Sequence, residues 1–115
     1  MNDAEGVLGP TVTRFVEDHV RSLLAWDVVV FFHRNQDVVI TSAELAERLG
    51  RREEEVDPEI DFLCRTGVLD CEDGLIQYKA SAENDLRIGE FVEACHDRSR
   101  RLALIALVLH RIARG

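Results

Sequence analysis

One short stretch of this chain is unusually rich in carboxylates. Six acids and no base lie between Glu53 and Asp61, and a second acidic pair follows further along the chain. Carboxylates can act as general acids or bases, but acid pairs occur throughout a chain with 22 acids and therefore single out no catalytic site. Ionised carboxylates also bind basic groups, so the following residues are candidates for an interaction surface: Glu53, Glu54, Glu55, Asp57, Glu59, Asp61, Glu72 and Asp73.

Signatures of catalysis and of cofactor binding are absent from the sequence. It contains no phosphate-binding glycine loop, nucleophile elbow or pair of zinc ligands. The three cysteines, Cys64, Cys71 and Cys95, are irregularly spaced and form no Cys-x-x-Cys motif. We expect them to be reduced, structural thiols, which supports a cytoplasmic location; a metal or redox sensor that also uses His96 is the alternative. We therefore predict no enzymatic activity, no cofactor and no metal site.

Charge is distributed unevenly along the chain. The 22 acids and 14 bases give a net charge of −8, which opposes non-specific attraction to nucleic-acid phosphates. Residues 98–114 nevertheless carry five arginines and no acid, a local charge of +5, while the rest of the chain carries −13. No apolar run approaches the ~18 residues of a membrane span, and the N-terminal residues lack the pattern of an export signal. These features predict a cytoplasmic protein without membrane contacts.

The first predicted element is a long helix over residues 11–34, with Thr11 or Thr13 as its N-cap. Its second half is apolar on nearly every side and rich in β-branched residues, which leaves a strand open as an alternative. A break near Trp26 is a further alternative. A turn then leads to a short predicted strand at 38–40.

The next segment contains the clearest local signal for a helix. Thr41 and Glu44 have the spacing of a capping box, in which the side chain of each residue accepts a hydrogen bond from the backbone amide of the other. Leu45, Ala46 and Leu49 form an apolar side, and a glycine follows at the position of a left-handed C-cap. This helix is therefore predicted to be short and well defined at both ends.

A further helix is predicted to follow and to end near Thr66, because Val56, Ile60 and Leu63 recur at helical spacing. Pro58 allows an alternative in which the helix begins only at that residue and the preceding acids form a loop.

Two elements complete the chain. Residues 67–80 have the pattern of a β-hairpin with a Glu-Asp-Gly turn, and residues 82–113 are predicted to form one helix. Every residue from Leu102 to Leu109 is apolar, so one side of this helix can cover the core and the other needs a second partner. We predict a homodimer, with a monomer covered by the N-terminal helix as the alternative. The predicted dimerisation residues are Phe91, Leu102, Ile105, Leu109 and Ile112.

The order of these elements and the segment "ITSAELAERLG…VDPEIDFLCRTGVLD" resemble a winged helix-turn-helix domain over roughly residues 21–80. The resemblance implies a mainly α fold with a small β-hairpin wing. The length of 115 residues predicts a single domain over residues 1–115, with an N-terminal helix at 11–34, the helix-turn-helix and wing at 41–80, and a C-terminal helix at 82–113. Bacterial members of this size are often dimeric transcriptional repressors that dimerise through terminal helices. The matching positions are Leu45, Leu49, Gly50, Val56, Ile60, Leu63, Gly67, Val68 and Leu69.

The acidic run conflicts with DNA binding, which is the activity that this resemblance implies first. A winged helix places the helix after the glycine turn in the major groove, where outward carboxylates would approach phosphates. Our leading hypothesis is therefore a transcription-regulator type of protein whose acidic face binds a protein with a basic surface. The alternative is a dimeric DNA-binding regulator that uses Arg51, Arg52 and Arg65, with the arginines of residues 98–114 as a further candidate set. Arg51, Arg52 and Arg65 could instead neutralise the neighbouring glutamates.

Overall fold

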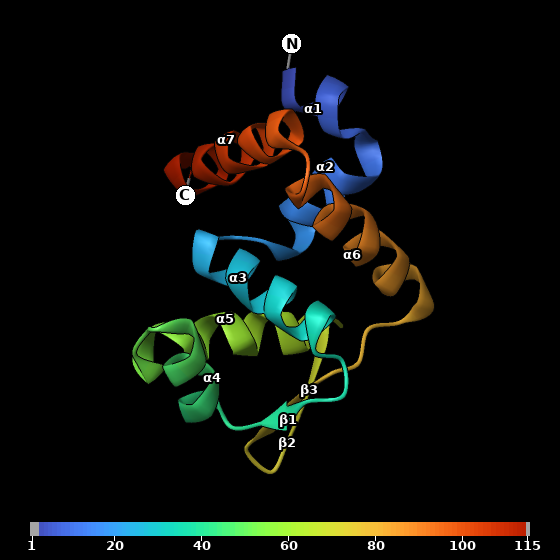
Figure 1. Cartoon of the computed structure of the whole chain (residues 1–115). Helices are drawn as coiled ribbons and strands as arrows, with labels where there is room; N and C mark the ends of the chain where they lie inside the picture. Colours follow the sequence, from blue (N-terminus) through green and yellow to red (C-terminus); the bar gives the residue numbers. More distant parts are fainter. Residues whose placement is uncertain (1–2, 115) are drawn as a thin grey trace.

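The chain is mainly helical, with a small three-stranded antiparallel sheet at one end of the molecule (Figure 1). The computed structural model describes residues 3–114. Buried apolar side chains of the helices and the sheet form one cluster, of which Phe15, Phe32 and Phe91 are the largest fully buried members. The predicted mainly α fold with a small β part is thereby confirmed. The elements are α1 (Asp3–Leu8), α2 (Pro10–His19), α3 (Leu23–Arg34), β1 (Val39–Ile40), α4 (Ser42–Leu49), α5 (Glu53–Arg65), β2 (Leu69–Glu72), β3 (Leu75–Tyr78), α6 (Ala82–Cys95) and α7 (Arg98–Arg114).

The prediction of one helix over 11–34 is wrong, because the chain forms two helices there. α2 begins directly after Gly9, whose φ of 85° favours glycine, so neither predicted threonine is its N-cap. α3 begins after Ser22, whose hydroxyl accepts a hydrogen bond from the backbone amide of Ala25 at 3.0 Å. The break therefore lies at this serine cap and not near Trp26, and the apolar second half is a helix and not a strand.

α4 has the two caps that the sequence predicts. The Thr41 hydroxyl accepts a hydrogen bond from the amide of Glu44 at 3.2 Å, and the Glu44 carboxylate accepts one from the amide of Thr41 at 3.0 Å. The second of these bonds is the main reason that the pKa of Glu44 lies below its usual value. Gly50 ends the helix in the left-handed conformation, with a φ of 67°. The capping box and the glycine cap are both confirmed.

α5 continues through Pro58, so the alternative of a shorter helix that begins at the proline is wrong. The turn before the proline contains Val56, which is fully buried and continues the apolar line of Ile60 and Leu63. In addition, the Pro58 carbonyl accepts a hydrogen bond from Nη2 of Arg21 at 3.0 Å. The burial of Val56 and this bond offset the helical hydrogen bond that proline cannot donate. The acids of this turn therefore lie on a helix and not in a loop.

The predicted hairpin is present, and a third strand joins it. β2 and β3 pair antiparallel with Cys71 opposite Ile76, and the turn between them uses Asp73 and Gly74, whose φ values are 54° and 79°. β1 pairs with the other side of β3, with Ile40 opposite Ile76, and the strand order is β1-β3-β2. The short strand predicted before α4 is therefore confirmed as the edge of this sheet.

The predicted helix over 82–113 is likewise two helices, because Asp97 interrupts it. Oδ2 of Asp97 accepts a hydrogen bond from the amide of Arg100 at 2.9 Å and caps the first turn of α7. Before the break, α6 buries Phe91 against Trp26, with the ring centroids 5.5 Å apart. After it, α7 turns back along α1 and α2 and lies at the opposite end of the molecule from the hairpin (Figure 1). None of the helices formed by residues 3–114 is long and apolar enough to cross a lipid bilayer.

Candidate functional site

The acids of α5 are divided between two sides of the helix. Val56, Ile60 and Leu63 are buried and fix the orientation of the helix on the core. The opposite side is exposed, and we call it the outer face of α5. Its members are Glu54, Asp57, Pro58, Asp61 and Arg65.

Glu59 lies on the inner side of α5 and holds two parts of the chain together. Its Oε1 accepts hydrogen bonds from Nε of Arg21 at 3.1 Å and from the hydroxyl of Ser22 at 3.0 Å. The side chain of Glu59 is only 12% exposed, and the guanidinium of Arg21 also lies over the ring of Phe62, 4.6 Å from its centroid. This carboxylate therefore connects α5 to the junction between α2 and α3, and it does not belong to a free acidic surface.

Glu53 and Glu55 are also occupied by neighbours in the fold. Oε1 of Glu55 accepts a hydrogen bond from Nε of Arg52 at 3.0 Å, and Oε2 accepts one from Nη1 of Arg51 at 3.4 Å. The bond from Arg52 is the main reason that the pKa of Glu55 lies below its usual value. Oε2 of Glu53 accepts from the hydroxyl of Ser42 at 2.8 Å. Two of the three arginines considered for DNA contact thus pair with a glutamate one turn away.

The three remaining acids of α5 have no ion-pair partner in the described part of the chain. Glu54, Asp57 and Asp61 are exposed on the outer face of α5. Because Pro58 has no N–H, the backbone carbonyl of Glu54 also lacks the helical donor four residues later. Three carboxylates and a carbonyl make this face an array of hydrogen-bond acceptors, with Arg65 as its single cation.

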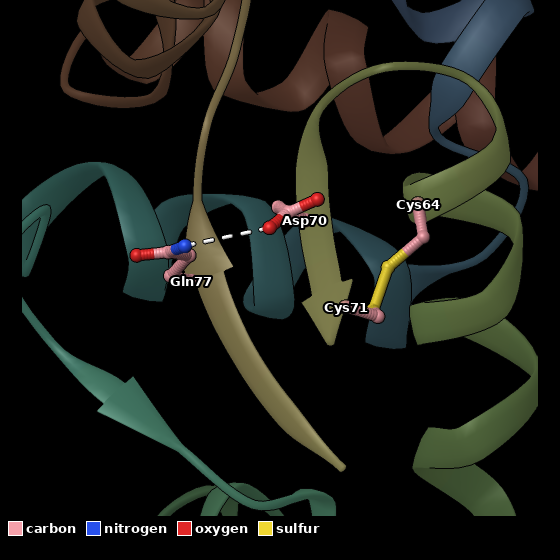
Figure 2. Close-up of a disulfide and its surroundings, with 4 residues drawn as sticks. All are labelled: Cys64, Asp70, Cys71 and Gln77. Atoms are coloured by element: carbon pink, nitrogen blue, oxygen red, sulfur yellow. Dashed lines mark hydrogen bonds between the residues drawn. A yellow bond between two sulfur atoms is a disulfide. The ribbon is translucent and has the colours of Figure 1, made fainter. Parts of the chain in front are cut away.

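The acids of the hairpin lie at its tip. Glu72 and Asp73 are exposed, and together with Val39, Leu75 and Gln77 they line a shallow hollow beside the sheet. Asp70 lies further from the tip, and its Oδ2 accepts a hydrogen bond from Nε2 of Gln77 on the neighbouring strand at 3.4 Å (Figure 2). The tip therefore adds two carboxylates that stay open to solvent.

A disulfide joins α5 to the hairpin, so the expectation of reduced thiols is wrong for this pair. Cys64, in the last turn of α5, is bonded to Cys71 of β2, and their Cα atoms lie 6.3 Å apart (Figure 2). The signal in the sequence was the spacing of seven residues across a helix end and the strand that follows directly. Because α5 and β2 are linked covalently, the outer face of α5 and the hairpin keep a fixed relation to each other. The disulfide also removes the support that free cysteines gave to a cytoplasmic location.

The third cysteine is a buried thiol. Burial raises the pKa of Cys95 to about 11, and the side chain belongs to the apolar core, as expected for a structural cysteine. Among residues 3–114 there is no group of three His, Cys, Asp or Glu side chains that could hold a metal ion.

The arginines near α5 and those of α7 come from different parts of the chain. Arg51 and Arg52 directly precede α5 and Arg65 ends it, whereas five further arginines belong to α7. Burial raises the pKa of Asp27 in α3, and Arg51 and Arg101 both act in the opposite direction, so both arginines lie near this carboxylate. Nη1 of Arg111 donates to the backbone carbonyl of Val16, so this arginine fastens α7 to α2.

Of the predicted dimerisation residues, one is buried in the core and the others lie on one side of α7. Phe91 is fully buried in the core of its own chain, so its assignment to a dimer contact is wrong. Leu102, Leu109 and Ile112 are 60%, 49% and 48% exposed. Ile105 is partly buried. These four residues, together with Ala106, form a side of α7 that we call the outer face of α7.

No protein-family model, curated protein sequence or solved structure matches this chain.

Proposed function

We propose that this chain is a winged helix-turn-helix protein of the transcription-regulator type that binds another protein through the outer face of α5. In this assignment α3, α4 and α5 are the three helices of that fold, and the β2–β3 hairpin is the wing. The order of the elements, the capped α4, the left-handed Gly50 and the strand order β1-β3-β2 support the assignment.

A single observation carries the proposed activity. The helix that would enter the major groove has acids on its outer face, and the carboxylates of Glu54, Asp57 and Asp61 have no ion-pair partner among residues 3–114. Phosphates and these carboxylates are both anionic acceptors, so their approach would be repulsive and would cost desolvation on both sides. The same array favours a partner that supplies donors and positive charge.

The charge of the surrounding segment supports the same conclusion. Residues 42–65 contain eight acids and four arginines, a net charge of −4. Arg51 and Arg52 are already paired with Glu55, which reduces their contribution to phosphate binding. Glu72 and Asp73 would place two further negative charges at the tip of the wing.

The spacing of the three carboxylates describes the partner. Glu54, Asp57 and Asp61 are separated by three and four residues and therefore follow one side of α5 over two turns, a distance of roughly 10 Å. An arginine-rich helix or extended segment can match this spacing with guanidinium groups, which bind carboxylates through two parallel hydrogen bonds. We therefore propose a basic protein segment as the ligand.

The proposal is tested with a fluorescein-labelled, arginine-rich peptide whose binding is followed by fluorescence anisotropy. In the test variant, Glu54→Gln, Asp57→Asn and Asp61→Asn remove three charges from the outer face of α5. In the control variant, Glu17→Gln, Glu90→Gln and Glu93→Gln remove three exposed charges from α2 and α6. We expect the first variant to weaken binding at least tenfold and the second less than twofold. Equal losses would mean that the peptide responds only to net charge, and the proposal would fail.

DNA binding is the second candidate function, and one observation favours it. Arg65 is exposed on the outer face of α5 and has no ion-pair partner among the residues that the structure describes. A DNA-binding regulator would combine it with Arg51 and Arg52 after their bonds to Glu55 are broken. Replacement of all three by glutamine would then abolish binding to duplex DNA.

A further inference from the structure

The outer face of α7 is aliphatic, and the rest of the described chain does not cover it. Leu102, Leu109 and Ile112 are about half exposed or more, whereas Leu104 on the opposite side is fully buried. Arg98 precedes Leu102 by four residues and therefore lies on the same side of the helix. Large aliphatic side chains that are exposed together on one side of a helix indicate a contact surface.

The arginines of α7 are divided between its two sides. Arg111 donates a hydrogen bond to a backbone carbonyl of α2, and Arg100 lines a hollow together with Glu93 of α6. Arg98 and Arg101 are exposed and have no ion-pair partner among residues 3–114. These two guanidinium groups are therefore available to a partner at the N-terminal end of the outer face of α7.

Two carboxylates lie near these arginines, but they do not cancel the positive charge. Asp97 caps the first turn of α7, and Asp27 of α3 lies near Arg101. Arg51 lies near Asp27 as well, and burial raises the pKa of Asp27 and so disfavours its charged form. With Arg98, three arginines therefore lie near two carboxylates. This end of the outer face of α7 keeps a net positive charge.

An aliphatic helix side that lies next to cations is complementary to a membrane that contains acidic lipids. Aliphatic side chains of such a helix enter the boundary between the headgroups and the acyl chains, and guanidinium groups bind the lipid phosphates. A fluid membrane adapts to a convex helix side, so the contact needs no groove. A second copy of α7, which has arginines near both ends, would place arginines next to arginines, whereas acidic lipids supply the opposite charge at both ends.

We propose that the outer face of α7 is a docking surface for a membrane that contains acidic phospholipids. In this arrangement α7 lies in the plane of the membrane. The side chains of Leu102, Leu109 and Ile112 enter its apolar layer, while the long side chains of Arg98 and Arg101 reach the phosphates. The sequence predicted no membrane contact because no apolar run is long enough to cross a bilayer, but a helix that lies on the surface needs no such run.

The negative charge of the whole chain does not prevent this contact. The net charge is −8, but residues 98–114 carry five arginines and no acid. The hairpin with its acidic tip lies at the opposite end of a molecule that extends 44 Å along its longest axis (Figure 1). Because the Debye length is about 8 Å at physiological ionic strength, the charges of the hairpin are screened at the membrane. Membrane docking through α7 is independent of a protein partner on the outer face of α5.

Sedimentation with sucrose-loaded vesicles tests the contact directly. One set of vesicles contains equal parts of phosphatidylcholine and phosphatidylglycerol, and the other contains phosphatidylcholine alone. The unmodified protein is expected to sediment with the acidic vesicles and to bind the neutral ones at least tenfold more weakly, because each arginine near an acidic surface contributes about fivefold. Absence of binding to the acidic vesicles, or equal binding to both sets, would overturn the proposal.

A pair of double variants tests the aliphatic part of the contact. Leu102→Ser with Leu109→Ser should weaken binding to the acidic vesicles at least tenfold, because two side chains no longer enter the apolar layer. Leu75→Ser with Leu86→Ser is the matched control, since these leucines are 43% and 71% exposed but lie on β3 and α6. Circular dichroism checks that each variant is folded. Equal effects of the two double variants would contradict docking through α7.

A second pair of double variants tests the charged part. Arg98→Gln with Arg101→Gln should weaken binding to the acidic vesicles at least tenfold. Arg65→Gln with Lys79→Gln removes the same charge from exposed positions near the hairpin and should change binding less than twofold. If the arginine variants of α7 lose binding while the serine variants of α7 keep it, the attraction is only electrostatic and the proposed insertion is wrong.

An environment-sensitive label identifies the side that enters the membrane. In a background with Cys95→Ser, Ala106→Cys carries a nitrobenzoxadiazole group on the outer face of α7, and Leu86→Cys carries it on α6. Acidic vesicles should shift the emission of the first label to shorter wavelength and leave the second unchanged. If the first label instead responds to rising protein concentration without vesicles, and Leu109→Ser removes this response, a second copy covers the face. That result would overturn the proposal.

Discussion

The outer face of α5 is acidic and the outer face of α7 is apolar, but both consist of residues whose counterparts on the inner side of the same helix are used within the chain. Each helix carries one kind of residue on two sides, carboxylates on α5 and aliphatic side chains on α7. In each case the inner residues, Glu59 on α5 and Leu104 on α7, contact other parts of the chain, whereas the outer ones have no ion pair or remain exposed within the described residues. Residues of one type therefore separate into those that stabilise the chain and those available to a partner. The acidic face should respond strongly to salt and the apolar face weakly.

The largest effect is expected from the residue that the dimer prediction misassigned. Phe91→Ala should lower the free energy of unfolding by about 3–5 kcal/mol, because it leaves a cavity next to Phe15 and Trp26. Leu102→Ala should leave the stability of the dilute monomer nearly unchanged, because 60% of this side chain is exposed. Urea denaturation at low protein concentration measures both. Equal losses would remove the distinction between the core and the outer face of α7.

The second largest effect is expected from the disulfide, which links α5 to the hairpin. Cys64→Ser should lower the free energy of unfolding by about 2 kcal/mol without reductant, since the bond closes a short loop between residues 64 and 71. With dithiothreitol the variant and the unmodified protein should be nearly equal.

Alkylation of the unfolded chain provides the control for this prediction. The unmodified protein has three cysteines and should accept one iodoacetamide group without reductant, at Cys95, and three after reduction. Three groups without reductant would show that Cys64 and Cys71 are thiols.

A comparison within α5 tests whether its acids have different roles. Glu59→Gln should cost about 1–2 kcal/mol, a reduced value for a mostly buried ion pair because the side chain of Arg21 is 36% exposed. Asp61→Asn removes an exposed carboxylate that has no ion-pair partner among the described residues, so it should change stability by less than about 0.5 kcal/mol. Thermal denaturation at neutral pH measures the two changes. If the two substitutions cost the same, the division of α5 into inner and outer acids is not correct.

The smallest effect is expected in the pH dependence of stability and comes from His19 of α2, which lies on neither outer face. His19 is 6% exposed, and its ring centroid lies 4.9 Å from that of Phe15. Burial lowers the pKa of His19, and the carboxylate of Asp18 acts in the opposite direction. The unfolded chain therefore takes up a proton at a higher pH than the folded chain does. Stability should fall as pH decreases through about 6.5 and level off below the folded pKa. His19→Phe should flatten this part of the stability curve.

Local signals predicted part of the fold, and contacts between distant residues determined the rest. The capping box of Thr41 and Glu44 and the left-handed Gly50 depend on residues four positions apart or fewer, and the sequence alone predicted them. Ser22 and Asp97 are also local caps, but the apolar periodicity on either side suggested that the helices continue. The bond between Arg21 and Glu59 joins residues 38 positions apart, and no pattern in one sequence indicates it.

The candidate sites were predictable to a similar degree. Composition located the acidic segment and the apolar end of the chain, because neither property depends on packing. Which acids remain free depended on Arg21, Arg51 and Arg52, and which apolar residues remain exposed depended on how Asp97 turns α7 away from α6. Sequence patterns therefore indicated both surfaces but not their members.

The central claim, that the outer face of α5 is built for a basic protein and not for DNA, is tested most directly with DNA itself. The measurement is the fluorescence anisotropy of a labelled, mixed-sequence pool of duplex DNA, titrated with the unmodified protein from low to physiological salt. We predict no binding even at low salt, because Glu54, Asp57 and Asp61 would oppose the phosphates. Binding that tightens steeply as salt falls, and that is lost when Arg51, Arg52 and Arg65 are replaced by glutamine, would contradict the claim.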